Sequence, residues 1–182
     1  MNPETGAALI QAGAISMMAL SAVGSGLGAG VAGSAAVGAW KRCYLQKKPA
    51  PFQLVVFVGA PLSQTIYGMI IMLLMNGKAQ KVIAAAQAAA TAAAQNSADA
   101  ASLLVTAITM AANWPFFFVG GIVAGIGMGI SAWMQGVAAA GCCDAFAETN
   151  TGFTNNLTIL GIIETVALFI MVFSIIMLLS IK

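Results

Sequence analysis

The sequence predicts an all-α membrane protein with four transmembrane helices, built as two tandem duplicated hairpins and assembling into a homo-oligomeric ring. Of its 182 residues, 60% are hydrophobic and 7% are charged, whereas soluble domains carry about 25% charged residues. Four apolar segments each exceed the roughly 20 residues that cross a bilayer. They occupy about residues 6–39, 52–75, 102–141 and 156–181. We therefore expect residues 1–182 to form a single membrane domain.

The segments group into hairpins according to their connections. Hairpin one, about 6–75, turns through "KRCYLQKKPAPFQ", where prolines stop helix propagation. Hairpin two, about 102–181, turns through the polar "CCDAFAETNTGFTNN". The segment 76–101 between them is rich in alanine, the strongest helix former, so we expect helical extensions outside the membrane. Low-complexity drift is the alternative to a functional role for this segment.

Basic residues predict the orientation of the chain. Four of them lie within 41–48, in the first hairpin turn, against Lys78 and Lys81 in the connecting segment. The positive-inside rule then places the hairpin turns in the cytoplasm and both termini outside. The beginning of the chain lacks the basic region of a signal peptide, so we expect the first apolar segment to be retained.

All three cysteines lie at the predicted cytoplasmic side, where thiols stay reduced. They are Cys43, Cys142 and Cys143. The chain contains no histidine, so the adjacent pair indicates packing at a helix end rather than a metal site.

The second hairpin repeats the first in the same direction. Three glycines recur at an offset of 101 residues: Gly24, Gly26 and Gly28 match Gly125, Gly127 and Gly129. At an offset of 100, Gln64-Thr65 matches Glu164-Thr165. The parallel repeat differs from the inverted repeats of many transporters.

The glycines give the first and third helices small faces that another backbone can approach closely. Ordinary packing within a hairpin explains the spacing as well as ring formation does. The density of glycine on the odd-numbered helices favours the ring, with the first and third helices in a crowded inner circle and the bulkier second and fourth facing lipid.

Glu164 is the candidate functional residue, because it alone among five acidic residues lies inside an apolar segment. An isolated carboxylate in hydrocarbon costs several kcal/mol, so it should be protonated or bound to a cation. A purely structural role is the less favoured interpretation. Gln64, its partner in the repeat, should also lie near the middle of the bilayer.

The segments "GAPLSQTIYGMIIMLLM", "QGVAAAG" and "IIETVALF" resemble the membrane rotor subunit (proteolipid, c or K) of V-type and A/V-type rotary ATPases. The resemblance covers all four helices. It implies a ring of identical subunits that turns against a stator, with one H⁺ or Na⁺ on each of them. It also implies a stator subunit that supplies an arginine, central-stalk subunits on the cytoplasmic side, and no bound cofactor beyond the transported ion.

By the same resemblance, a sodium ion would be bound by Glu164, Gln64, Ser63 and the backbone carbonyl of Ala60. Tyr67 would hydrogen-bond the glutamate. As alternatives, Gln64 could serve only as an interhelical hydrogen-bonding residue and Tyr67 only as core packing.

The family's further ligand, a glutamine on the third helix, is ambiguous in this chain. Alignment on "VAAAG" puts it at Met134, with Gln135 one residue later and about 100° round the helix. Whether Met134 or Gln135 faces the site is left open, although a longer turn before Glu164 would compensate for the shift.

Oxygen-bearing side chains beyond what a proton site needs favour Na⁺ over H⁺. The sequence lacks a Ser/His/Asp set and a phosphate loop, so we expect a non-catalytic subunit, with ATP hydrolysis on partner subunits. It has no basic cluster for nucleic acid. One rival is a small four-helix ion channel or secondary transporter that uses Glu164 to bind a cationic substrate. Another is a purely structural membrane oligomer, whose function would not be lost when Glu164 is replaced by glutamine.

Overall fold

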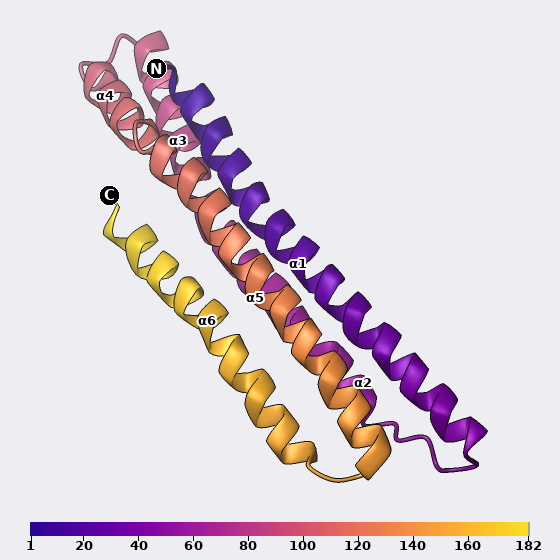
Figure 1. The fold of residues 1–182 in the computed structure, drawn as a ribbon. Helices are drawn as coiled ribbons and strands as arrows, with labels where there is room; N and C mark the ends of the chain where they lie inside the picture. Colours follow the sequence, from indigo (N-terminus) through magenta and orange to yellow (C-terminus); the bar gives the residue numbers. More distant parts are fainter. Residues whose placement is uncertain (182) are drawn as a thin grey trace.

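The computed structural model describes residues 1–181 and consists of long helices that run side by side (Figure 1). In chain order the elements are α1 (Pro3–Leu45), α2 (Leu54–Gly59), the 3₁₀ turn η1 (Ala60–Leu62), α3 (Ser63–Ala94), α4 (Ala100–Ala111), α5 (Trp114–Thr149) and α6 (Phe153–Ser180). Among residues 1–181, four helical segments are long and apolar enough to cross a membrane: Pro3–Leu45, Leu54–Ala94, Ala100–Thr149 and Phe153–Ser180. The predicted all-α membrane architecture is confirmed.

α1 and α5 run in the same direction and pack along most of their length. Four of the predicted packing glycines lie in this contact. Gly24 faces the backbone of Gly129, Gly28 faces Ala132, and a Cβ on Gly125 would lie 3.0 Å from the Met17 carbonyl oxygen. The missing side chains let the two backbones approach closely, which is what holds helices together in lipid.

The other two predicted packing glycines lie outside that contact. A Cβ on Gly26 would have no neighbour within 4 Å, because two residues from Gly24 correspond to about 200° round the helix. Gly127 faces the Ile170 side chain of α6, with 2.9 Å between a Cβ at that position and Ile170 Cδ1. The repeated Gly-x-Gly-x-Gly pattern therefore serves different neighbours in the protomer.

α6 lies on the side of α5 away from α1 (Figure 1) and is the least buried of the long helices. Its buried residues are Leu160, Ala167 and Leu178. Large apolar side chains such as Phe169 and Phe173 are each 62% exposed. α6 therefore presents bulky apolar side chains on the surface of the protomer.

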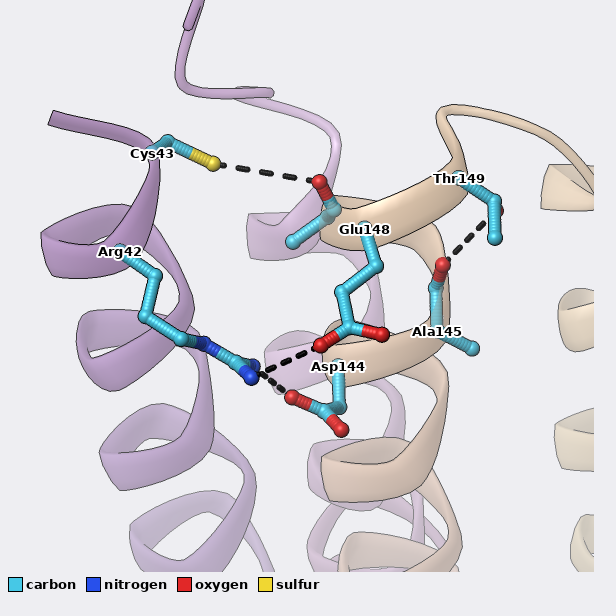
Figure 2. Close-up of polar contacts among 7 residues, drawn as sticks. Arg42, Cys43, Asp144, Ala145, Glu148 and Thr149 are labelled. Atoms are coloured by element: carbon cyan, nitrogen blue, oxygen red, sulfur yellow. Dashed lines mark hydrogen bonds and ion pairs between the residues drawn. The ribbon is translucent and has the colours of Figure 1, made fainter. Parts of the chain in front are cut away.

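An ion-pair cluster joins the two hairpins at the turn end of the bundle (Figure 2). Arg42 of α1 donates to Glu148 at 2.9 Å and also pairs with Asp144, both on α5. Beside it, the Cys43 thiol lies 3.9 Å from the Ala147 carbonyl. Asp144 and Glu148 of the second hairpin thus neutralise the positive charge of Arg42 in the first.

α1, α3 and α4 extend beyond the C-terminal end of α6 (Figure 1). α6 ends level with Lys78, whose ammonium donates to the Ile181 carbonyl. Beyond Lys78, residues 79–94 of α3 continue for about 24 Å at 1.5 Å per residue. Together with α4 and residues 3–10 of α1 they form a three-helix projection. The expected helical extensions are present within 76–101.

The expected third span, 102–141, lies within the candidate membrane span Ala100–Thr149, which the structure divides into two helices. Residues 102–111 belong to α4 in the projection, and α5 begins only at Trp114. Apolar composition continues across the break, whereas Pro115 can lie only in the first turn of a new helix. The spans are also longer than expected at the turn end, where α5 reaches Thr149.

Gly24→Ala should destabilise the protomer by about 1–3 kcal/mol, because the new methyl group would overlap the Gly129 backbone. Gly26→Ala is the matched control, since its Cβ meets open space. The measurement is loss of helicity during SDS titration in mild detergent. Equal midpoints for the two variants would show that the α1–α5 contact is looser than described.

Candidate ion site

Pro61 shapes the first part of the site. Proline has no backbone N–H, and the chain passes through the 3₁₀ turn η1 there before α3 begins at Ser63. The Ser63 hydroxyl donates to the Ala60 carbonyl at 3.2 Å and lies 3.2 Å from Gln64 Oε1. Three oxygen atoms of α3 and the preceding turn therefore gather at one point.

Two glutamines connect α3 to the second hairpin. Gln64 Nε2 donates to Gln135 Oε1 at 2.7 Å, and Gln135 Nε2 donates to the Leu160 carbonyl of α6 at 3.0 Å. Both glutamine side chains are fully buried. The chain of hydrogen bonds crosses from α3 through α5 to α6, which satisfies amides that have no water to bind.

Of the two candidates on the third helix, Gln135 is the one that contacts Gln64. Gln135 shares the buried face of α5 with Ser131 and Ala139, four residues to either side. Met134 is 51% exposed and lies on another face. The longer turn before α6 includes Asn150 at φ 53° and Gly152 at φ 78°, two left-handed residues that set where α6 begins.

A hydrogen bond joins Glu164 of α6 to α3. The Tyr67 hydroxyl donates to Glu164 Oε1 at 2.5 Å. Tyr67 follows Ser63 by four residues, one turn along α3, and both Tyr67 and Glu164 are half-buried. The carboxylate is therefore accessible from the side of the protomer.

Sequence reasoning missed two contributors from the second hairpin. The Leu160 carbonyl orients Gln135, and the Ser131 hydroxyl donates to the Ile163 carbonyl at 3.3 Å. A backbone carbonyl leaves no signal in the sequence. Ser131 could have been found from its position four residues before Gln135.

One group of contacts brings together two amide oxygens, a hydroxyl and a backbone carbonyl. About one turn farther along α3, Tyr67 holds the carboxylate of Glu164. Hard cations prefer such oxygen ligands. Among the described residues, 1–181, no group of three His, Cys, Asp or Glu residues forms a metal site of another kind. The chain's single arginine, Arg42, is paired at the turn end rather than with Glu164.

Residues 118–177 match the family model of the C subunit of ATP synthase. The match covers most of α5 and α6 and includes both Gln135 and Glu164. It confirms the predicted resemblance to a rotor proteolipid on the second hairpin. Members of this family are membrane subunits that form rings, and catalysis lies on other subunits. Comparison with curated proteins gives no match.

Gln64→Leu should cost about 1–3 kcal/mol, because it leaves the buried Gln135 oxygen without its donor. Replacing both glutamines by leucine should cost less than the two single changes added together. Unfolding in sodium-free detergent measures the cycle, with Met134→Leu as the exposed control. Strict additivity would mean that the two amides do not interact.

Proposed function

We propose that this chain is the rotor-ring subunit of a V-type or A/V-type ion-translocating ATPase and carries one ion per subunit on Glu164. The observation that supports it most is the carboxylate of Glu164 on an apolar span, hydrogen-bonded to Tyr67, which lies about one turn along α3 from the buried pair formed by Gln64 with Gln135. The family match over the same hairpin supports the rotor role. The V-type assignment rests on two hairpins that share a single carboxylate.

The mechanism follows from the cost of charge in hydrocarbon. When Glu164 is protonated or bound to a cation, the site is neutral and can pass lipid as the ring turns. The carboxylate becomes free only beside a fixed positive charge, which we assign to an arginine of the stator subunit. One ion leaves there towards one side of the membrane, and another enters from the opposite side.

We favour Na⁺ as the transported ion. A proton needs only Glu164 and an acceptor, whereas Gln64, Ser63, the Ala60 carbonyl and Gln135 supply oxygen atoms suited to Na⁺. In this assignment Tyr67 holds the carboxylate in place. The amides reorient so that their oxygen atoms face the ion.

The remaining partners follow from the rotor role. Identical subunits complete the ring, and central-stalk subunits bind its cytoplasmic end, where the hairpin turns lie. ATP is hydrolysed by other subunits. Replacing Glu164 by glutamine abolishes transport, because the site can then never change its charge.

Carbodiimide labelling tests the site, since this reagent modifies a protonated carboxyl group. Glu164 should be labelled selectively among the five acidic residues. Na⁺ should slow the labelling at fixed pH and ionic strength, whereas K⁺ should not. Gln64→Leu should weaken the sodium protection because it removes one ligand.

Met134→Leu is the control variant for this experiment and should keep full sodium protection. Labelling that follows pH but is unaffected by Na⁺ would make the chain a proton rotor. A monomeric protein that binds a cationic substrate saturably would instead favour the alternative function, a small channel or secondary transporter.

Introduced cysteines test the orientation, because the native thiols at positions 43, 142 and 143 are buried. Ala98→Cys lies in the exposed turn after α3, and Thr151→Cys lies in the exposed turn between α5 and α6. An impermeant maleimide should label Ala98→Cys in intact cells and Thr151→Cys only in inverted vesicles. The reverse pattern would place the hairpin turns outside.

A further inference from the structure

The projection beyond the end of α6 has an exposed apolar surface. Leu104, Val105 and Ile108 of α4 are 46%, 60% and 39% exposed. All of α4 lies farther out than the end of α6, because Ala111 contacts Gly6, while Gln11 is level with Asn76. Bulky aliphatic groups thus lie beyond the hydrocarbon that covers α6, where contact with water is unfavourable.

The apolar side of α4 continues into the membrane along α5. On α5, exposed branched side chains at positions 119, 123, 126 and 130 recur at intervals of four, three and four residues, so they follow one face of that helix. On α4, Val105 and Ile108 are three residues apart and share a face. We call these residues together the α4–α5 stripe: Val105, Ile108, Val119, Val123, Ile126 and Ile130. Their exposed fractions run from 39% to 63%.

In the projection, the exposed sides of α1 and α3 carry small residues. On α1 these include Thr5 and Ala8. In the projection the exposed side of the α3 extension is mostly alanine, including Ala84 and Ala88. We call Thr5, Ala8, Ala84 and Ala88 the small-residue face of the projection. The same protomer carries the bulky stripe on α4 and α5.

We propose that the projection forms a collar around the ring, in which the α4–α5 stripe of one copy packs on the small-residue face of the next. This inference rests on the ring of the proposed function. The two faces differ, so the contact is heterologous and repeats from copy to copy until the ring closes. Lipid can cover the stripe along α5 but not along α4. In the ring, a second copy stands at the same height and supplies the cover.

The collar gives the alanine-rich connecting segment a role. Ring contacts confined to the membrane would act over the length of α6, whereas the projection adds about 24 Å of aqueous contact. In water, burial of aliphatic groups is driven by the hydrophobic effect, which lipid does not provide between membrane helices. The collar therefore contributes a different kind of force to ring stability.

Charge substitutions on α4 test the collar. Val105→Glu and Ile108→Glu, made separately, should each lower the temperature at which the purified ring dissociates in mild detergent by about 5 °C or more. Thr106→Glu is the matched control, because Thr106 is exposed on the same helix but lies off the stripe. Native mass spectrometry reports ring size, and helicity reports folding of the released subunits.

Cross-linking locates the contact. Subunits with Ile108→Cys and subunits with Thr5→Cys are produced together, so that a short bismaleimide can join the two types only across copies. Joined dimers are expected in the wild-type-sized ring and should be lost when Val105→Glu is added.

Three outcomes would overturn the collar. Val105→Glu, Ile108→Glu and Thr106→Glu could behave alike, or a ring of normal size could give no joined dimers. Either result would leave the rotor role standing. Cross-links only to another polypeptide of the intact complex would replace the second copy by a partner subunit. A wild-type chain that forms no ring would instead overturn the proposed function itself.

Discussion

The close approach of α1 and α5 is the constraint on which the rest of the structure depends. In lipid, side chains gain little by leaving the solvent, so helices associate through tight packing and polar contacts. Gly24 and Gly28 remove the side chains that would hold the two helices apart. α3 also packs tightly on α1, since a Cβ on Gly68 would lie 2.6 Å from the Ser21 hydroxyl. α1 is therefore the common support of both hairpins.

That support brings the polar residues of different helices together. Gln64 of α3 and Gln135 of α5 meet because each helix is held at close distance to α1. In hydrocarbon an unpaired amide would cost several kcal/mol, so the pair is stable only if both helices keep this position. Packing of small residues and pairing of polar ones thus require the same arrangement.

The sequence predicted those features that depend on composition and repetition. The spans, the tandem hairpins and the intramembrane Glu164 follow from hydropathy and the offset of about 100 residues. The choice between Met134 and Gln135 could not be made, because a shift of one residue rotates a side chain by about 100°. The Arg42 cluster was missed for another reason. It requires knowing that the ends of α1 and α5 lie at the same height, which no local pattern encodes.

The contacts that attach α6 to the other helices differ along its length, and those near Glu164 affect the ion site. Near Glu164 it is held by polar contacts from Tyr67, Gln135 and Ser131. Towards its C-terminal end it separates from α5 around an apolar crevice of about 650 Å³, lined on the two sides by residues such as Gly120 and Phe173. The polar contacts on either side of Glu164 are therefore also part of what attaches its helix to α3 and α5. A change at Glu164 that breaks the Tyr67 bond removes one of the few directional contacts that fix α6, so occupancy of the site and the position of this helix are physically linked.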